Sequence, residues 1–376
     1  MKNKIFISVI LCLTMMVLML AGCSKTEVSK KMSDSESKIT ASNEEKTITI
    51  TDGSGAQVKI PSKVTRIADA WGAHNEIMAT IGAADKIVAT TLTPEVRPWL
   101  YKANPVLKNA VTAFSINASE TNVEELLKTK PDIVFMSLND KLAKQITDLG
   151  IPAVQLKITD LESLKECVRL TGTIVGGEAK ENAEKYISYL DEKMKMIGNV
   201  TSKIPQEQRP KILHIASFSP LTVDGKDAII TSGIELAGGI NVADVTGNSK
   251  ATSLEQVFQW NPDMIIMGRV LTGNGLNNSA SVSDTDAGKI MNDPIWNQLK
   301  AVKDKKVFIN PDGAFSWDRY SAEEALQLQW MAKLINPDKF TDIDMVKETR
   351  YFFKSFMKYD LSEEEANKML AGEAPS

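Results

Sequence analysis

The sequence predicts an α/β fold in which two Rossmann-like lobes are joined by a single long helix, with a cleft between the lobes. Short apolar segments of strand length alternate with helical segments in both halves of the chain, which favours a mainly parallel sheet in each half. Between the halves lies a stretch with helical spacing that contains no proline or glycine from Glu178 to Met196. Two lobes joined by one rigid helix is the simplest architecture with this order of elements.

The first lobe is expected to span residues 47–176. It opens with a β-hairpin, because two alternating segments flank Gly53-Ser54-Gly55. Further along, Asn122 can cap a helix that Lys130-Pro131 stops. Apolar runs and helical spacing predict strands at 66–71, 87–91, 133–136 and 153–156, and helices at 74–82, 122–130, 141–149 and 161–170.

The connecting helix is expected at 177–205, where apolar residues fall at three- and four-residue steps. An uninterrupted helix resists bending, because sharp kinks generally need proline, glycine or a similar defect. The second lobe is expected to span 206–376. We predict its strands at 211–217, 221–225, 264–268 and 307–309, and two closing helices at 322–334 and 345–356.

The N-terminal residues indicate export. Lys2 and Lys4 precede an apolar run from 5 to 20, which is the pattern of a signal peptide spanning residues 1–22. The run is shorter than the roughly 20 residues that span a bilayer comfortably, which argues against a transmembrane anchor. It ends in Leu20-Ala21-Gly22-Cys23, which resembles the bacterial lipobox. The resemblance implies that Cys23 is acylated and anchors the protein at the extracytoplasmic face of the cell membrane.

Residues 23–46 are expected to form a flexible, lipid-anchored tether, since they are rich in Ser, Lys, Glu and Thr and almost lack large apolar side chains. Cysteine usage agrees with this processing. Cys12 is lost with the signal peptide and Cys23 carries the lipid, so Cys167 remains alone and no internal disulfide is possible. The spacing of Cys167 from Leu164 places its thiol on the buried face of a helix, as a packed rather than reactive group.

The charge of the chain bears on its partners. It has 44 basic and 48 acidic residues. Removal of the signal peptide takes away Lys2 and Lys4 and no acid, which leaves 42 basic and 48 acidic residues and a net charge of −6. An acidic chain of this kind argues against a nucleic-acid partner.

One pattern occurs in both halves: a helix that carries a glutamate near its start, stops at x-Pro-Asp and enters a buried strand. In the first half it begins with Asn122-Val123-Glu124 and ends at Lys130-Pro131-Asp132. In the second half it begins with Ser253-Leu254-Glu255 and ends at Asn261-Pro262-Asp263. The pattern favours two lobes of related construction.

Two further motifs lie in the second half: Ala237-Gly238-Gly239-Ile240-Asn241-Val242-Ala243 and Trp317-Asp318-Arg319-Tyr320-Ser321-Ala322-Glu323. With the paired glutamate helices and the lipobox, they make the chain resemble, from Val64 to Phe356, the helical-backbone (class III) substrate-binding proteins of ABC importers. That family includes receptors for ferric siderophores, haem, cobalamin, some free metals and oxyanions. The resemblance implies a monomeric binding lipoprotein with a ligand cleft between its lobes and a small opening motion, which delivers a metal-containing small molecule to an ABC permease.

The resemblance also implies that Glu124 and Glu255 dock the permease, because family members use one glutamate near the top of each lobe for this contact. Glu125 remains a rival of Glu124 for this role. Acids in the first turn of a helix also have a simple electrostatic explanation, since they favour the positive end of the helix dipole.

Candidate ligand-binding residues follow from the rule that ligands of open α/β sheets bind beyond the carboxyl ends of the strands. They are Trp71, His74, Asn75, Thr91, Ser137 and Asn139 in the first lobe, and Phe218, Arg269, Trp317 and Arg319 in the second. Arginine offers a planar fork suited to carboxylate, phosphate or oxyanion groups, and aromatic rings can form the walls of a site for a large flat ligand. Each candidate also has a structural interpretation, as a helix cap, a surface charge or a packing aromatic. His214 lies in the middle of a strand and is interpreted as a core residue.

The histidine content bears on the ligand. A protein-built site for bare zinc or manganese usually needs three or four side-chain ligands, commonly with several histidines, and the chain has two histidines in all. A chelated metal or an oxyanion such as molybdate is therefore favoured, and among these we favour an iron complex such as a ferric siderophore or haem. Cobalamin, an oxyanion and a free metal ion stay open, and no resident cofactor is expected.

An enzyme is disfavoured, because the sequence has no Gly-x-Gly-x-x-Gly after a strand, no Walker loop, no His-Glu-x-x-His and no nucleophile elbow. A metal-dependent hydrolase of this architecture would need more histidines and paired acids near strand ends. A structural surface lipoprotein stays open on composition, but it leaves the paired glutamate helices unexplained.

Overall fold

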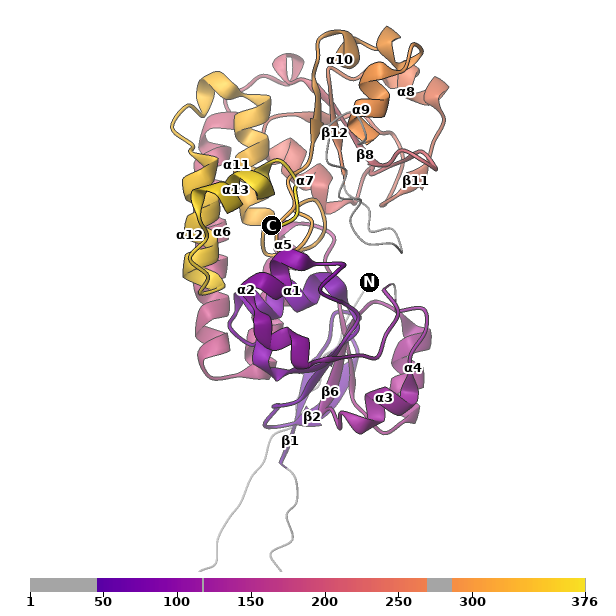
Figure 1. The fold of residues 1–376 in the computed structure, drawn as a ribbon, viewed down its shortest axis with the longest axis vertical. Helices are drawn as coiled ribbons and strands as arrows, with labels where there is room; N and C mark the ends of the chain where they lie inside the picture. Colours follow the sequence, from indigo (N-terminus) through magenta and orange to yellow (C-terminus); the bar gives the residue numbers. More distant parts are fainter. Residues whose placement is uncertain (1–45, 117, 269–285, 376) are drawn as a thin grey trace, which may run out of the picture. The chain divides into compact units, whose positions relative to one another are not determined.

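The computed structural model of the chain describes residues 46–116, 118–268 and 286–375 (Figure 1). Four predictions concern residues outside these ranges: the signal peptide at 1–22, the tether at 23–46 apart from its last residue, the lipid anchor at Cys23 and the ligand contact at Arg269. Within the described ranges, no helix has both the length and the apolar character that crossing a membrane requires.

The first lobe is built on a five-stranded sheet of order β5-β4-β3-β6-β7, in which the pairs of neighbouring strands are parallel. The central strands are apolar and buried, as expected for a parallel sheet that helices cover. The strands are β3 (Ile67–Asp69), β4 (Ile87–Thr90), β5 (Val111–Thr112), β6 (Ile133–Ser137) and β7 (Ala153–Leu156). The helices are α1 (Gly72–Thr80), α2 (Pro98–Ala103), α3 (Val123–Lys128), α4 (Asp140–Asp148) and α5 (Leu161–Val175).

The predicted hairpin, β1 (Thr47–Thr51) and β2 (Gln57–Pro61), is antiparallel and separate from this sheet. Its turn docks on β7. Asp52 Oδ2 accepts the N–H of Gln155 at 3.1 Å, and the N–H of Gly53 donates to the carbonyl of Gln155 at 2.7 Å. A Cβ at Gly53 would lie 2.9 Å from that carbonyl oxygen, so the close approach of turn and strand requires glycine.

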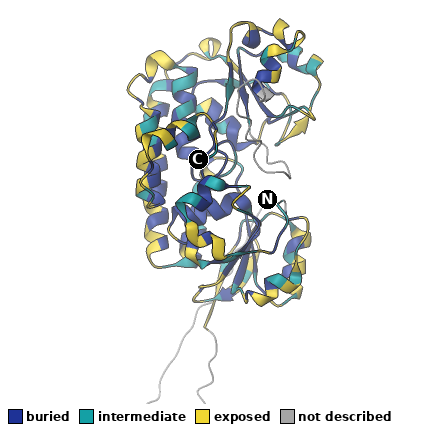
Figure 2. Cartoon of the chain, in the orientation of Figure 1, coloured by how far each residue is buried: buried dark blue, intermediate teal, exposed yellow. Residues whose placement is uncertain are grey.

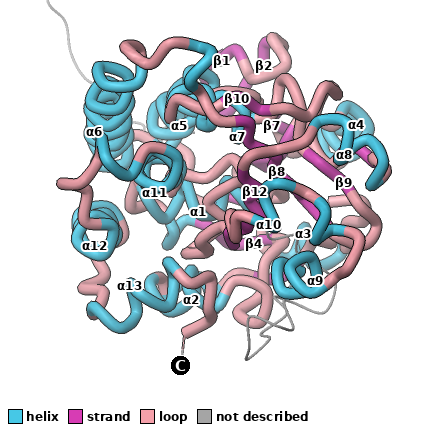
Figure 3. The backbone as a smooth tube through the Cα atoms, turned by 90° about the horizontal axis from the view of Figure 1, so that it is seen from above, coloured by secondary structure: helices cyan, strands magenta, loops and turns pink. Residues whose placement is uncertain are grey.

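The second lobe has a sheet of order β11-β9-β8-β12-β13, with β10 also pairing with β8. Strands β8, β12 and β13 are parallel, while β9 runs antiparallel to β8. The strands are β8 (Lys211–Ser217), β9 (Thr222–Val223), β10 (Ile240–Asn241), β11 (Lys250–Ala251), β12 (Met264–Met267) and β13 (Val307–Ile309). The helices are α7 (Ile229–Leu236), α8 (Leu254–Trp260), α9 (Asp286–Asn292), α10 (Lys300–Lys303), α11 (Glu324–Ile335), α12 (Met345–Phe356) and α13 (Glu363–Leu370). Helices surround the strands of both sheets (Figure 3), and the prediction of two α/β lobes is confirmed.

Helix α6 (Glu178–Thr201) lies within the range predicted for the connecting helix. It packs on α5 and α1 of the first lobe and on α11 and α7 of the second (Figure 1). Gly172 of α5 allows the close approach of α6, since a Cβ there would lie 2.6 Å from the Cβ of Ala183. The lobe boundaries at 47–176 and 206–376 stay predictions.

The repeated helix–Pro-Asp–strand pattern has the same structural role in both lobes. The carboxylate of Asp132 accepts the N–H of Arg66 at 2.8 Å, and the N–H of Asp132 donates to the carbonyl of Arg66 at 2.7 Å. Asp263 exchanges the same two bonds with Lys211, at 2.9 and 2.8 Å. Each aspartate therefore joins the start of the strand that follows it to the start of the neighbouring parallel strand.

One cluster of buried side chains extends through both lobes, from Ile67 and Phe135 of the first sheet to Leu328 and Phe352 in helices of the second lobe (Figure 2). Cys167 belongs to this cluster and is 3% exposed. Its burial raises the pKa of the thiol to about 12, so the thiol stays protonated. The prediction of a packed, unreactive cysteine is confirmed.

Several helices differ from the prediction, since α9 and α10 were not predicted and three others also depart from it. Helix α1 begins at Gly72, two residues before the predicted start, because its first turn consists of small residues without an apolar pattern. Helix α2 was not predicted, since six residues are too few to show a helical period. The prediction that two helices close the chain was wrong, because α13 follows α12. Its signal was present, since Ser362 and Glu365 form a capping box.

Helices α1 and α2 bond directly to the second lobe and to the C-terminal segment. Glu76 Oε2, on α1, accepts the N–H of Ala322 at 2.7 Å. The indole N–H of Trp99, on α2, donates to the carbonyl of Glu373 at 2.8 Å. The two lobes are therefore joined by polar contacts in addition to α6.

Arg97, which precedes α2, makes a buried ionic contact between the lobes. Its two terminal nitrogens lie 3.1 Å from Asp312 Oδ1 and 3.1 Å from Ser316 Oγ of the second lobe. The guanidinium carbon also lies 4.0 Å from the centre of the Phe315 ring, in a cation–π contact. The side chains of Arg97 and Asp312 are each 1% exposed, so each charge depends on the other.

Glu76 should make the stability of the protein fall as pH rises. Burial raises its pKa from 4.5 to about 7, so the folded state holds this proton more tightly than the unfolded chain. The free energy of unfolding should therefore decrease between pH 4.5 and about 7. Titration of Glu76 should contribute about 3 kcal/mol to this decrease. Urea unfolding at a series of pH values measures this slope.

Glu76→Gln removes the titration and keeps an oxygen for the N–H of Ala322, so it should flatten the slope. Burial also raises the pKa of Glu323 and Glu324, and these two groups should supply the slope that remains. The control is Glu192→Gln, at a position on α6 whose side chain is 74% exposed, and it should keep the wild-type slope. An unchanged slope in Glu76→Gln would contradict the prediction.

Loss of Arg97 should destabilise the protein strongly. Arg97→Met leaves Asp312 buried without its arginine, which costs about 3–5 kcal/mol in the free energy of unfolding. Adding Asp312→Asn should recover part of that loss, because the buried carboxylate charge is then removed as well. Arg169→Met removes an exposed pair with Glu184 and should cost less than about 1 kcal/mol. Equal effects of the two arginine changes would show that the buried pair is not the main lobe contact.

Candidate functional site

A cavity of about 330 Å³ lies between the two lobes, at the carboxyl ends of β3, β4 and β6. This is the edge at which ligands of open α/β sheets bind. The cavity is lined by Ala70, Trp71, Gly72, Ala73, Leu92, Arg97, Ile116, Ala118 and Ser137 of the first lobe, and by Ser249, Phe315, Arg319 and Tyr320 of the second.

The first-lobe wall contains the N-terminus of α1. Trp71 occupies the N-cap position, and its side chain makes no capping hydrogen bond. The first N–H groups of a helix have no partner within the helix, so those of Gly72 and Ala73 are donors at the wall of the cavity. Such a helix N-terminus favours a negatively charged ligand, both by its N–H groups and by its dipole.

The second-lobe wall brings together one charged, two hydroxyl-bearing and one aromatic side chain. Arg319 is 15% exposed, and its Nη1 lies 2.6 Å from Asp224 Oδ2. Tyr320 has a positive φ of 52°, an uncommon conformation for a bulky residue, and its ring packs on Trp71 at 5.9 Å between centroids. Ser249, with a φ of 51°, has its N–H fixed by Asp224. These contacts hold the polar groups of the wall in place.

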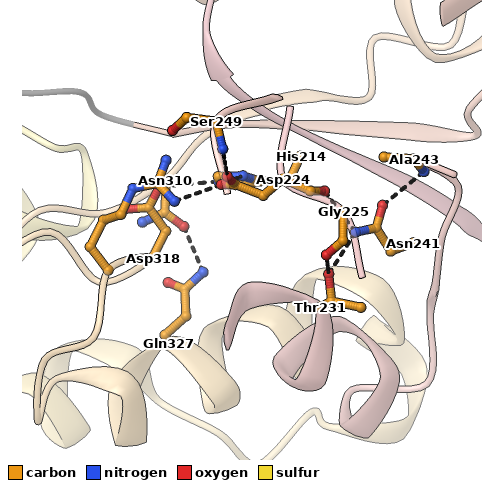
Figure 4. A network of polar contacts seen from close by, with 11 residues as sticks. His214, Asp224, Gly225, Thr231, Asn241, Ala243, Ser249, Asn310, Asp318 and Gln327 are labelled. Carbon is orange, nitrogen blue, oxygen red and sulfur yellow. Dashed lines mark hydrogen bonds and ion pairs between the residues drawn. The ribbon is translucent and has the colours of Figure 1, made fainter. Parts of the chain in front are cut away.

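His214 lies behind this wall, between two carboxylates. Its Nδ1 lies 2.9 Å from Asp224 Oδ2 and its Nε2 lies 3.1 Å from Asp318 Oδ2, and all three side chains are 0% exposed (Figure 4). The backbone of Asp224 is fixed in turn by Asn241, whose side-chain amide donates to the Asp224 carbonyl at 2.9 Å. Asn241 belongs to the Gly-Gly motif that supported the family resemblance, so one role of that motif is to position this loop.

The two acids and two bases adjust one another's pKa values. Burial opposes ionisation of His214, but its contacts with Asp224 and Asp318 outweigh burial and raise its pKa above 6.5. Burial likewise opposes ionisation of Asp318, but Arg319 and His214 lower its pKa below the usual range. The pKa of Asp224 is also lowered, by His214 and Arg319 against burial. These contacts favour the charged form of all four groups, and in that form their charges cancel.

Three of the predicted ligand-binding residues line the cavity: Trp71, Ser137 and Arg319. Trp71 lies two residues after β3 and Ser137 is the last residue of β6, as the strand-end argument required. Arg319 lies on the loop after β13, and Asp224 accepts one of its hydrogen bonds.

His74 and Asn75 are corrected by the structure, because neither side chain lines the cavity. His74 is 0% exposed; its ring nitrogens lie 2.8 Å from Asp69 Oδ2 and 2.8 Å from Thr171 Oγ1. Asn75 is 1% exposed and accepts a hydrogen bond from Thr90 Oγ1 at 2.7 Å. The helix starts at Gly72, so both residues fall one turn deeper than predicted and stabilise the first lobe.

Four more candidates lie elsewhere. Thr91 is buried and donates to the Ser115 carbonyl, and Asn139 caps α4 by accepting the N–H of Leu142. Phe218 packs on the ring of Trp296 inside the second lobe, with centroids 6.0 Å apart. Trp317 is 0% exposed, and its indole N–H donates to Glu323 at 3.1 Å. Their own partners in the fold therefore account for these side chains, and none of the four lines the cavity.

Ten lining residues were not predicted, and those among them with polar or aromatic side chains are Arg97, Ser249, Phe315 and Tyr320. Tyr320 stood in the quoted Trp-Asp-Arg-Tyr motif and follows a predicted site residue. Arg97 and Ser249 lie in segments where no strand end was predicted, so the strand-end rule passed over them. Phe315 follows Gly313 and Ala314 in the long loop after β13, which brings it to the cavity.

No cluster of three or more His, Cys, Asp or Glu side chains in the described residues has the arrangement of a metal site. The polar groups at the cavity include hydrogen-bond donors: backbone N–H groups, hydroxyls and the guanidinium groups of Arg97 and Arg319. Chemically, this arrangement suits recognition of an oxygen-rich anion.

Comparison with known proteins agrees with this geometry. Residues 28–314 match the family described as periplasmic binding protein. The molybdate-binding protein MolA of Haemophilus influenzae is 26% identical over 336 residues, which cover 82% of this chain and 90% of MolA. The Fe(3+)-citrate-binding protein YfmC of Bacillus subtilis is 24% identical over 316 residues, which cover 82% of this chain and 89% of YfmC.

Solved structures of the same kind share the fold. The structure of MolA bound to molybdate has a TM-score of 0.71 and 25% identity, and the match covers 84% of this chain and 99% of MolA. A periplasmic solute binding protein from Veillonella parvula has a TM-score of 0.70 and 30% identity, covering 86% of this chain and 97% of that chain. The predicted resemblance to class III binding proteins is confirmed. The chain belongs to the periplasmic binding protein family and is an extracytoplasmic substrate-binding protein of an ABC transporter.

Proposed function

We propose that the protein captures a small oxyanion of the molybdate type and delivers it to an ABC permease. The observation that carries this proposal is the interlobe cavity of about 330 Å³, to which both lobes contribute hydrogen-bond donors. This volume lies at the lower end of the roughly 300–1,000 Å³ of typical ligand sites, so a small ion fits it better than haem or cobalamin. The similarity to MolA, whose structure holds molybdate, supports the same ligand class.

The donors are arranged for an anion. The N–H groups of Gly72 and Ala73 face it from the first lobe, with the partial positive charge of a helix N-terminus behind them. Ser137, Ser249 and Tyr320 add hydroxyl groups at the cavity wall. Hydrogen bonds rather than excess positive charge hold the anion, because Arg319 is already balanced by Asp224 and Asp318.

A compact ferric complex such as ferric citrate is the second candidate. The apolar and aromatic walls formed by Trp71, Leu92 and Phe315 favour a ligand with carbon atoms, and YfmC is a relative named for ferric citrate. Larger iron complexes lose support, since a siderophore or haem needs more room than this cavity offers. The oxyanion is therefore preferred over the iron complex that the sequence favoured.

The cellular setting remains part of the proposal. Cys23, after the small residues Ala21 and Gly22, anchors the protein by a lipid, and residues 23–46 tether the folded part to the membrane. The protein acts as a monomer and has no enzymatic activity, in line with a family of transport proteins.

The purified full-length chain should bind molybdate and tungstate with one site per molecule in isothermal titration calorimetry. Arg319→Gln should weaken this binding about ten- to hundredfold, because a hydrogen bond to a charged group contributes about 1.5–3 kcal/mol. Arg169→Gln, which changes an exposed arginine on α5, is the matched control and should leave the affinity unchanged.

Ferric citrate, a ferric siderophore, haem and cobalamin should be titrated in parallel. Binding of ferric citrate without binding of either oxyanion would replace the first candidate by the second. Binding of haem or cobalamin alone would contradict both candidates and indicate a cavity that opens much wider.

Glu124 and Glu255 should dock the permease. Both are exposed near the start of a glutamate helix, α3 or α8, and one such helix lies in each lobe (Figure 1). Glu124→Lys combined with Glu255→Lys should abolish uptake, because each introduced lysine would repel the arginines of the permease that the glutamate is proposed to contact. Ligand affinity should stay unchanged, since neither residue lines the cavity. Uptake of radiolabelled molybdate by cells and calorimetry of the purified variant measure the two effects.

Glu124 and Glu125 both lie 2.9 Å from Lys128, so they must be separated by experiment. Glu125→Lys alone should leave uptake near the wild-type level, as should the control Glu192→Lys on α6. Normal uptake by the double variant would contradict docking through these helices, and loss of uptake in Glu125→Lys alone would assign docking to Glu125.

A further inference from the structure

We infer that His214 is a positioning residue of the proposed anion site: as an imidazolium it holds Asp224 and Asp318, which fix Arg319 and Ser249 at the cavity wall. This inference rests on the proposed function and goes further, because it assigns a role in ligand binding to a residue that does not line the cavity. It also predicts which charge state of the protein accepts the anion.

The contacts form a continuous chain from His214 to the cavity. His214 Nδ1 lies 2.9 Å from Asp224 Oδ2 at ion-pair distance, and Arg319 Nη1 donates a hydrogen bond to the same oxygen at 2.6 Å. Asp224 Oδ1 accepts the N–H of Ser249 at 2.6 Å (Figure 4). Both Arg319 and Ser249 line the cavity, so one buried carboxylate orients two groups of its wall.

The second nitrogen of Arg319 supplies the link to a ligand. Nη2 is buried and lies 3.9 Å from Asp318 Oδ2, which is beyond hydrogen-bond distance. Among the described residues, no acceptor makes a hydrogen bond with Nη2. A buried N–H without a partner is costly, so an oxygen atom of a bound anion is the acceptor that would satisfy it.

The position of the imidazole is set by packing as well as by charge. A Cβ at Gly268, directly after β12, would lie 2.5 Å from Asp318 Oδ2 and 2.9 Å from His214 Cε1. The cluster therefore packs against bare backbone at this point. The two ring nitrogens lie 2.9 and 3.1 Å from carboxylates of aspartates whose side chains are 0% exposed.

The charges around His214 determine the pH dependence. The groups that face it are Asp224 after β9 and Asp318 after β13, with Arg319 paired to both. With His214 protonated, two positive and two negative groups cancel. With His214 neutral, the cluster carries one net negative charge beside a site for an anion.

Three further groups act on this cluster from neighbouring elements. Arg97 of the first lobe interacts with Asp318, and Glu324 of α11 also lies near it. Burial raises the pKa of Glu324 and of Tyr320, which favours the neutral form of both. His214 is the group of the cluster whose ordinary pKa, 6.5, lies nearest the physiological range, and its surroundings raise that pKa.

The direction of the effect follows from the raised pKa of His214. Below that pKa the cluster is neutral and affinity for a dianion is at its maximum; as pH rises through it, affinity should fall about tenfold or more. His214→Gln keeps a polar side chain of similar size without the charge. It should bind molybdate about tenfold or more weakly at pH about 6 and show little dependence on pH up to about 9.

The control is His74→Gln, which removes the other buried histidine that contacts an aspartate. Since His74 lies outside the cavity, this variant should keep the wild-type slope of affinity against pH. It also leaves His214 as the single histidine, because the chain has two. Nitrogen-15 NMR of this variant should then show one imidazolium that stays doubly protonated above pH 6.5, the ordinary value for histidine.

Gly268→Ala tests the same cluster by shape instead of charge. It should weaken molybdate binding and retain the pH slope, since His214 is still present. If circular dichroism shows that His214→Gln does not fold, the molybdate affinity of Gly268→Ala and the NMR titration of His214 test the inference instead.

The outcomes separate the two proposals. Failure of the wild type to bind any oxyanion overturns the proposed function. Oxyanion binding by the wild type with unchanged affinity and slope in His214→Gln overturns only the role of His214. An imidazole that becomes neutral at or below pH 6.5 also overturns it, whatever the ligand.

Discussion

The guanidinium of Arg97 crosses from the first lobe into the second, where it lies 3.1 Å from Asp312 and 4.0 Å from the centre of the Phe315 ring. Either charge would be very costly to bury alone, so the two lobes are held in the one arrangement that pairs them. Arg97 and Phe315 also line the cavity. The interaction that stabilises the lobe contact therefore also sets the distance between the two walls of the site.

Buried charged side chains also pair with one another in the second lobe, where the cluster is larger. His214, Asp224, Asp318 and Arg319 are buried or nearly so, and their charges cancel. A neutral cluster does not attract every anion that approaches, so selection depends on hydrogen bonds of defined direction. The helix N-terminus at Gly72 supplies such donors without adding a full charge that would itself need a partner.

Much of the fold could be predicted because its elements have local causes. Capping by Asn122 and Ser253, the Pro-Asp turns and the apolar strands all act over a few residues, and each appears where the sequence indicated. The start of α1 could not be placed from local pattern, because Gly72 is a poor helix former that is tolerated for its place at the cavity. An error of two residues there was enough to put His74 and Asn75 in the cavity instead of in the lobe interior.

The sequence by itself determined the α/β class, the two-lobe order, the connecting helix and the edge of the sheets at which a site forms. Those features depend on hydrophobic period, caps and strand ends, which are properties of short segments. Only the tertiary structure decided which polar side chains remain available to a ligand. Trp317 and His74 were predicted to lie beyond strand ends, yet Glu323, Asp69 and Thr171 use their donors and acceptors. Arg97 and Ser249 reach the cavity from loops. The role of a loop residue depends on contacts with distant segments, and Arg97 and Asp312 are more than 200 positions apart in the sequence. No local pattern encodes such contacts.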